Sequence, residues 1–414
     1  MVRSLGMVFS AGVAACGLVA PAFAQDEAPE TGWAETGWET SVDVVLVASA
    51  VDDDNAAAPA ADALMASALL SISREDTFDN GFTLGWRLAG RYERDALSRP
   101  AFAGALGGCS AAIPACSGIG GLLPVSPATG LAAGGALLDE DGFVTLETAA
   151  VSLLTPWGEG VLGADAGVAA RLDARPPTVM RRVSVLSTGL DPTGLSVTRS
   201  RNDVTGSSAK ASYMSPRWLG LRVGASFTPE ASLRSADFDP DAGGAGRATA
   251  DLENVWEGAV SFARQFAEQD LRVRAAVTYS TAESGAGLAA FGDYEAWGAG
   301  LELEHAEWTV GARWLSSNNA WEAGSGDYDA WEIGLVRQEG DWRFGFEAGW
   351  ASDELTATEG VSWLAGVGWN VNEHVNLGVA WASSEADLPV AAGPGLGHTN
   401  ARNDGLLVEL SVRN

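Results

Sequence analysis

Lysine is almost missing from this chain: Lys210 is the only one among 414 residues, and 25 basic residues stand against 54 acidic ones. The formal net charge of −29 repels a polyanion, which argues against binding along the phosphates of a nucleic acid. Histidine is nearly as rare. His305 and His374 fall in expected short turns and His398 in an expected long loop, so none stands beside a serine as a hydrolase requires. The sequence therefore indicates neither a nucleic-acid-binding protein nor an enzyme.

Long apolar runs are also missing. Beyond residue 24 no run of about 18 apolar residues occurs, so no transmembrane helix is expected there. Residues 1–24 contain Arg3, an apolar stretch over Leu5–Ala20 and the cleavage motif Ala22-Phe23-Ala24, which together predict a secretory signal peptide. A lipoprotein signal ending at Cys16 is the less favoured alternative. Hydrophobic residues make up 47% of the chain, which excludes disorder of the exported residues 25–414.

Cysteine is scarce as well. Removal of Cys16 with the signal peptide leaves Cys109 and Cys116, an even pair in an oxidising compartment. The stretch around them is rich in Gly, Ser and Ala, so we expect one disulfide that stiffens a loop and has no redox role. A zinc site would need two further ligands, and none lies nearby in the sequence. We expect no metal and no cofactor at these cysteines.

Hydrophobic residues recur with a period of two along most of the chain, which is the pattern of β-strands with one oily and one polar face. In residues 342–350, Trp342, Phe344, Phe346 and Trp350 alternate with Arg343, Gly345, Glu347 and Gly349. In residues 81–95, the same pattern places Arg87 and Arg91 on the face opposite Trp86. Tryptophans gather near strand ends, as in the aromatic girdles of membrane barrels.

The links between these segments are alternately short and long, which is the layout of an outer-membrane barrel. Short turns include 267–270 and 339–341, and long links include 229–250, 281–292, 317–327 and 384–404. A closed, all-β antiparallel transmembrane barrel pairs every backbone N–H and C=O, as lipid requires. A soluble β-sandwich or propeller is the alternative, but its oily faces would point inward. We expect sixteen strands: Trp38–Ala50, Leu64–Glu75, Gly81–Asp95, Phe143–Leu154, Gly158–Gly163, Ser207–Met214, Leu219–Thr228, Asp251–Gln265, Leu271–Ser280, Asp293–Glu304, Trp308–Ser316, Tyr328–Gln338, Trp342–Ser352, Gly360–Asn370, Val375–Ser383 and Gly405–Arg413.

One turn carries a resemblance to a known family. Tyr213-Met214-Ser215-Pro216-Arg217-Trp218-Leu219-Gly220 is similar to the Tyr-x-Ser-Pro-x-x-x-Gly turn that joins the sixth and seventh strands of the general bacterial porins of Gram-negative bacteria. Residues 79–85 resemble the family's second short turn and third strand, and residues 143–163 resemble its fourth and fifth strands. The chain departs from the family at its end, where Asn414 stands in place of the usual terminal Phe. That departure weakens the assembly signal expected of the last strand.

The resemblance implies a water-filled outer-membrane channel for passive diffusion of small hydrophilic solutes and ions. It also implies a homotrimer surrounded by lipid and lipopolysaccharide. The third long loop, about residues 164–206, is expected to fold into the barrel and narrow it, with loop carboxylates facing wall arginines. A substrate-selective channel for sugars or dicarboxylates and a structural or adhesive barrel are the alternatives. The candidate constriction residues are Asp43, Arg87, Arg91 and Arg222 on the wall, and Asp165, Arg171, Asp173, Arg175 and Asp191 on the loop.

Two further expectations concern acidic loops. Residues 237–241 (Asp-Phe-Asp-Pro-Asp) could bind calcium, but they lack the EF-hand spacing, so a solvated loop tip is favoured. Acids at the channel mouths, in the long loops and in residues 26–39, should concentrate cations within a Debye length of about 8 Å at physiological salt. We therefore expect a weak cation preference at low salt that declines as salt rises.

Overall fold

The computed structural model describes residues 37–53, 64–94, 143–185, 190–231, 250–285, 289–392 and 395–414. Three expectations lie outside these residues: the signal peptide 1–24, the Cys109–Cys116 disulfide and the acidic stretch 237–241. Within the described ranges, no helix is long and apolar enough to cross a membrane. The same ranges contain no group of three or more metal-binding side chains.

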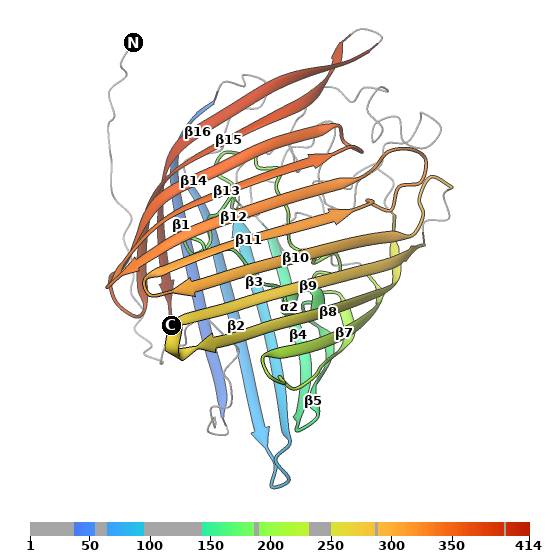
Figure 1. Ribbon diagram of the computed structural model, residues 1–414, viewed down its shortest axis with the longest axis vertical. Coiled ribbons are helices and arrows are strands. Elements are labelled where there is room, and N and C mark those ends of the chain that lie inside the picture. Colours follow the sequence, from blue (N-terminus) through green and yellow to red (C-terminus); the bar gives the residue numbers. More distant parts are fainter. Residues whose placement is uncertain are drawn as a thin grey trace.

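The described residues form sixteen antiparallel strands in a closed barrel, because β1 pairs with β16 and every other strand pairs with its neighbours in sequence (Figure 1). The strand count and the closed topology expected from the sequence are confirmed. Two short helices accompany them, α2 (Val168–Arg171) and the 3-10 turn η1 (Ala267–Gln269). The strands are β1 (Trp38–Asp53), β2 (Leu64–Thr77), β3 (Thr83–Arg94), β4 (Phe143–Thr155), β5 (Gly158–Ala164), β6 (Ala209–Met214), β7 (Leu221–Glu230), β8 (Leu252–Phe266), β9 (Leu271–Ser284), β10 (Tyr294–His305), β11 (Trp308–Ser317), β12 (Tyr328–Glu339), β13 (Trp342–Asp353), β14 (Thr358–Asn370), β15 (Val375–Ala392) and β16 (Gly395–Arg413).

The alternation of each strand turns its oily residues outward. On β13, Trp342, Phe344 and Phe346 are exposed on the outer face, whereas Glu347, next to Phe346, is fully buried inside. Tryptophans pair across neighbouring strands at the barrel ends, and the Trp342 and Trp369 rings stack with their centroids 5.5 Å apart. Because indole rings favour the boundary between lipid and water, these pairs mark one edge of the membrane-embedded band.

The turn between β6 and β7 is the one that resembled the family motif. Leu219 and Gly220 both adopt positive φ there, at 50° and 92°. A Cβ at Gly220 would also lie 2.9 Å from the carbonyl oxygen of Ala263, so the turn requires glycine twice over, for its conformation and for its space. This explains the final Gly of the motif.

Two strands differ from expectation by far more than the small shifts at the ends of the others. Residues 384–404 were expected to form a long loop, but β15 and β16 continue through them as a paired hairpin, from Ser384↔Asn403 to Ala392↔Gly395. Figure 1 shows this hairpin projecting beyond the rest of the barrel. Outside the lipid the outer face of a strand contacts water, so the outward oily residues that mark membrane strands are not needed there. Glu385 and Arg402 are exposed on this face, whereas Ala386 and Leu388 lie in the core. The sequence therefore placed the end of β15 too early and the start of β16 too late.

A β-bulge interrupts β4. Its pairing with β3 shifts between Ala89↔Thr148 and Gly90↔Leu146, which leaves Glu147 as the extra residue. A bulge turns a side chain away from the regular alternation. Here it lets Glu147 reach Arg91 on the lumen side, with Arg91 Nε donating to Glu147 Oε1 at 2.6 Å.

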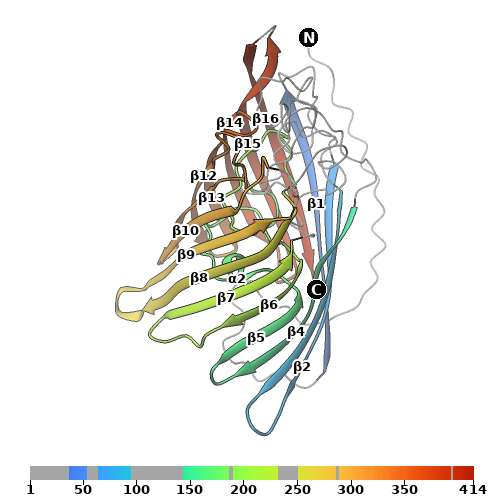
Figure 2. The ribbon, with the colours of Figure 1, turned by 90° about the vertical axis from the view of Figure 1, so that its right-hand side faces the viewer.

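Residues 165–208, which we call the inner segment, join β5 to β6, and their described parts, 165–185 and 190–208, lie inside the barrel (Figure 2). A first run, residues 168–185, follows the lumen wall from β6 to β16 near the short-turn ends of the strands. A return run, residues 190–208, follows the same wall nearer the long-link ends. On β14, for example, Gly368 faces Val179 of the first run, and Gly360 faces Val197 of the return run. The inner segment corresponds in sequence to the third long loop that was expected to fold inward.

Part of the barrel interior is a dry core, and not the wet lumen that its polar strand faces suggested. At the long-link end, Leu195, Val197 and Val204 of the return run pack with wall residues such as Tyr328 and with Trp321 of the link after β11. The wall residues of this core come from several strands between β8 and β16, and alanines such as Ala296, Ala330 and Ala351 among them make room for the return run. The prediction of a polar interior therefore holds only toward the short-turn end of the barrel and along the wall away from this core.

Candidate functional site

A row of glycines on the lumen face receives the first run of the inner segment. Each of these glycines faces atoms of residues 174–180, and they lie on six consecutive strands, β10 to β15: Gly300, Gly311, Gly334, Gly345, Gly368 and Gly378. A Cβ at Gly311 would lie 2.9 Å from Pro176 Cα, and one at Gly345 would lie 3.1 Å from Val179 Cβ. Both separations are shorter than an ordinary carbon–carbon contact. The missing side chains let the segment lie flat against the wall, and we call the row the glycine track.

Buried carboxylates of the wall hold the backbone of the first run. Glu409 on β16 accepts hydrogen bonds from the backbone N–H groups of residues 181, 182 and 183 at 2.7, 2.9 and 2.9 Å. Glu347 on β13 accepts one from Val179 N at 2.8 Å and one from the Ser184 hydroxyl at 2.6 Å. Bonds to a charged acceptor are stronger than neutral ones, at about 1.5–3 kcal/mol each. These two glutamates therefore fix the middle of the segment to the wall.

Lys210, the single lysine of the chain, holds the two ends of the segment together. Its Nζ donates to the carbonyl oxygen of Asp165, at the start, and to that of Gly206, at the end, the latter at 2.8 Å. The side chain is buried on the lumen face of β6, with the carboxylate of Glu257 among the negative charges around it. Lys210 therefore fixes the start and the end of the inner segment beside each other.

Arg313 on β11 binds both runs at once. Its guanidinium donates from Nη1 to Asp173 Oδ2 at 2.7 Å and from Nε to the Ser200 hydroxyl at 2.6 Å. On the wall, Nη2 donates to Glu332 Oε2 at 2.8 Å. The Asp173–Arg313 pair is the kind of contact that the resemblance implied, although Arg313 was not among the candidates. Arg313 alternates with outward-facing residues such as Trp314, so the period-two pattern could have identified it as a lumen residue.

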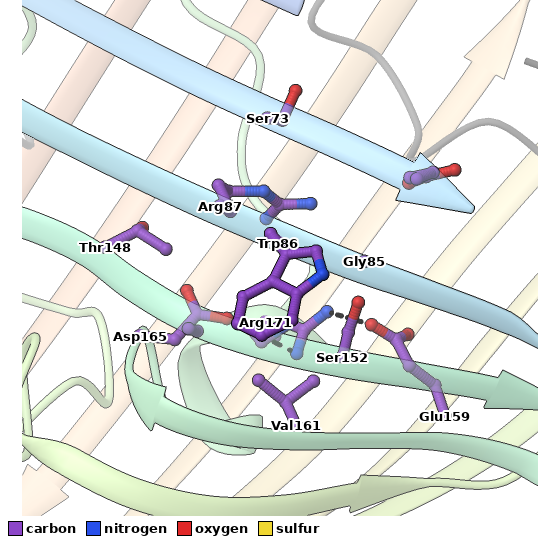
Figure 3. A pocket seen from close by; sticks show the side chains of 12 residues that line it. Ser73, Gly85, Trp86, Arg87, Thr148, Ser152, Glu159, Val161, Asp165 and Arg171 are labelled. Atoms are coloured by element: carbon purple, nitrogen blue, oxygen red, sulfur yellow. Dashed lines mark hydrogen bonds and ion pairs between the residues drawn. The ribbon is translucent and has the colours of Figure 1, made fainter. Parts of the chain in front are cut away.

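On the opposite part of the wall, strands β2 to β5 border a small hollow of about 50 Å³ (Figure 3). Arg87 of β3 lines it and has no hydrogen-bond or ion-pair partner in the described part of the chain. Arg171 of α2 binds Glu159 Oε1 at 2.9 Å and lies 3.6 Å from Asp165 Oδ2. Glu75 also lines the hollow, so two arginines and three carboxylates share it.

The other wall candidates lie on the lumen face, each with a charged neighbour. Arg91 forms the ion pair with Glu147 described above, at 2.6 Å. Arg222 lies 3.4 Å from Glu159, near the turn that follows β6. Asp43 is half-buried on β1, at the position paired with Arg413 of β16. Arg222 and Asp43 thus lie toward the short-turn end of the barrel.

The loop candidates divide into structural and exposed groups. The buried Asp191 accepts hydrogen bonds from Thr193 N at 2.9 Å and Ser196 N at 2.8 Å, so its oxygens build a turn. The expectation that Asp191 lines the constriction is therefore not met. Arg175, by contrast, has a side chain that is accessible from the lumen, although it lies deep within the barrel. Repulsion from Arg201, together with burial, lowers the pKa of Arg175 to about 10, so it stays cationic at neutral pH.

The charge arrangement is largely the reverse of the implied one. Among the described residues of the inner segment, the exposed charged side chains are Arg175 and Arg181, whereas the four aspartates are buried or half-buried. The wall instead supplies buried glutamates. A carboxylate can accept several backbone N–H bonds at once, so a wall glutamate anchors the segment better than an arginine, which has no acceptor. The Asp173–Arg313 contact is the exception to this reversal.

A closed antiparallel barrel with an oily outer face, aromatic edges and a long segment folded inside defines a class: the outer-membrane β-barrel channels. The family model described as Gram-negative porin matches residues 11–388. The chain belongs to that family. It is thus an outer-membrane porin, a channel through which small solutes diffuse passively across the outer membrane.

Solved structures share the fold at low sequence identity. An anion-selective porin from Comamonas acidovorans is 12% identical, with a TM-score of 0.51 over 92% of this chain and 100% of that one. OmpF of Salmonella typhi, in complex with daunomycin, is 10% identical, with a TM-score of 0.52 over 92% and 98%. OprB of Pseudomonas putida is 10% identical, with a TM-score of 0.53 over 91% and 94%. The comparison with curated proteins gave no match.

Proposed function

We propose that water, ions and small hydrophilic solutes cross the barrel between the inner segment and the wall formed by β2 to β5, a path that we call the passage. The observation that carries this is where the inner segment is bound. Its anchors and the glycine track fix it against β6 to β16, while Arg87 on β3 faces an open hollow. Arg171 and Arg175 border the passage on the segment side, and Arg87 and Arg91 on the wall side.

The passage is proposed to be a general diffusion path, without a dedicated substrate. Planar-bilayer recording of the purified protein tests this: single-channel conductance should rise in proportion to salt, and neutral sugars should enter liposomes at rates that fall smoothly with size. Uptake that saturates for one sugar or one dicarboxylate, while isomers of the same size and charge are excluded, would support a substrate-selective channel. Absence of any conductance would support a structural or adhesive barrel.

We also propose that the channel is a homotrimer within lipid and lipopolysaccharide, as the resemblance to general porins implies. Residues 1–24 would be removed on export, and diffusion through the passage needs no cofactor and no catalytic residue. Light scattering of the detergent-purified protein measures the oligomeric state directly. A monomer mass that persists across several detergents would rule out the trimer and leave the diffusion path unaffected.

A further inference from the structure

We propose that Arg175 and Arg201 of the inner segment form a binding site for the oxyanion groups, carboxylate or phosphate, of solutes in the passage. This inference rests on the proposed diffusion function, because it names the class of solute that the passage favours. It concerns a pair of arginines that the anchoring of the segment does not use.

The negative charges around this pair are already bound within the protein. Arg313 holds Asp173 and Glu332, whose side chains are 5% and 0% exposed. Arg199 pairs with Asp203 at 3.2 Å. The group as a whole has four arginines and three carboxylates, and its carboxylates face the protein. A net positive charge is therefore presented to the lumen.

The two proposed ligands of the anion lack counter-charges of their own. Arg175 has no hydrogen-bond or ion-pair partner in the described part of the chain. Arg201 has one distant contact, 3.9 Å to Asp203 Oδ2, and its Nε is buried without an acceptor. Arg313 brings the two arginines to the same part of the lumen, because it binds Asp173, two residues before Arg175, and Ser200, the neighbour of Arg201. Their guanidinium groups repel each other, which agrees with the lowered pKa of Arg175. An anion between them would remove that repulsion and supply the missing acceptors.

The shape of the guanidinium group indicates which anions bind. Its planar fork of N–H donors matches the paired oxygens of a carboxylate or phosphate, and such bidentate bonds are stronger than contact with a spherical chloride. The hollow around Arg87 does not offer the same site, because three carboxylates line it beside its two arginines. Arg87 is therefore the matched comparison: an arginine in the same passage, in a setting with net negative charge.

Salt should separate this site from the acidic mouth of the channel. Exposed carboxylates crowd the long-link end of the described strands, at Asp251, Glu253, Glu283, Asp293, Glu295, Glu322, Asp327, Glu354, Glu359 and Glu385. Their attraction for cations fades as the Debye length falls from about 10 Å at 0.1 M salt to about 3 Å at 1 M. The confined arginines are screened less. Screening of the mouth carboxylates alone would only abolish the cation preference as salt rises. With the arginine site present, selectivity should instead pass to a preference for anions.

The test measures block of the chloride current by added oxyanions. Purified channels in planar bilayers at fixed ionic strength receive inorganic phosphate in one arm and succinate in the other, with chloride as the reference. We expect saturable block in the wild type and in Arg87→Gln. In the double variant Arg175→Gln, Arg201→Gln the block should be at least about tenfold weaker, the factor for loss of one charge-assisted contact. Block in one arm alone would identify phosphate or carboxylate as the group recognised.

Several outcomes would overturn the proposal. Equal block in the double variant and the wild type would show that the two arginines do not bind the anion. Block that chloride reproduces at the same concentration would reduce the effect to screening. Arg175→Lys, Arg201→Lys keeps the charges but loses the forks, and full block by that variant would refute bidentate recognition. A wild-type protein without any current would instead refute the proposed diffusion function, and unheated gel migration shows whether each variant is folded.

Discussion

One added methyl group on the glycine track should push the inner segment into the passage. At Gly311 the new Cβ would lie 2.9 Å from Pro176 Cα, whereas carbon atoms in contact are about 3.5–4.0 Å apart. The segment must then move by about 0.6 Å or more to restore that separation. At Gly334 the Cβ would overlap the carbonyl oxygen of Pro177, so the displacement is larger. Pro176 and Pro177 have fixed φ angles and cannot absorb it locally.

Two opposing effects decide the stability of these variants. Overpacking costs about 1–3 kcal/mol, whereas replacing glycine by alanine in a strand gains about 0.5–1 kcal/mol. The net change for Gly311→Ala and Gly334→Ala is therefore a loss of up to about 2.5 kcal/mol, larger at Gly334. Gly258→Ala is the matched control, because Gly258 lies on the outer face of β8 with nothing within 4 Å of its Cβ position. The Gly258→Ala variant should therefore show only the gain in stability that alanine brings to a strand.

Single-channel conductance and the temperature at which the folded band disappears on unheated gels are the two measurements. We expect conductance to fall in the order Gly258→Ala, Gly311→Ala, Gly334→Ala, with the thermal midpoint falling in parallel. Conductance that rises in Gly334→Ala would mean that the segment moves away from the passage. Conductance equal to that of the control in both track variants would refute the seating of the segment on these glycines.

Three further predictions test the anchors and the loop staple. Glu409→Ala leaves three backbone N–H groups of the inner segment without their acceptor, at a cost of about 1–3 kcal/mol for each that water does not reach. Because the segment is then held less firmly, the noise of the open-channel current should increase. Unchanged noise would show that this anchor is dispensable. Lys210→Met removes the contacts that join the two ends of the inner segment. It should lower the thermal midpoint more than Arg74→Met, which removes an ion pair with Asp76 near the short turn after β2; equal midpoints would contradict this. Non-reducing mass spectrometry should find one Cys109–Cys116 bridge, and the double Ser variant should still conduct, since failure to insert would mean that this loop is misplaced.

The strands could be predicted because lipid imposes a rule that sequence can display. On β13 the alternation of Trp342 to Phe346 with Glu347 and its neighbours follows from the contrast between lipid and interior, and it is confirmed. That contrast ends where β15 and β16 leave the membrane, so their extension through residues 384–404 carried no such signal. The bulge at Glu147 is likewise a local change of register that alternation alone does not show.

The interior could be predicted only in part. Alternation correctly placed Arg87, Arg91 and Arg222 on the lumen face, and it would have placed Arg313 there too. It could not reveal that Glu347 binds the backbone of Val179, because that contact joins residues 168 positions apart through a backbone group that every residue has. Inward position is a property of one strand, whereas an anchor depends on how the inner segment crosses many strands.

The anchors also set an order of assembly. The inner segment enters the chain before β6, but Glu409, which accepts three of its N–H groups, lies on β16, the strand that closes the barrel against β1. The first run therefore cannot be fixed at residues 181–183 until the last strand is in place. Until then the glycine track and Glu347 hold only its earlier part. The attachment of the inner segment thus depends on a strand that lies more than 200 residues further along the chain.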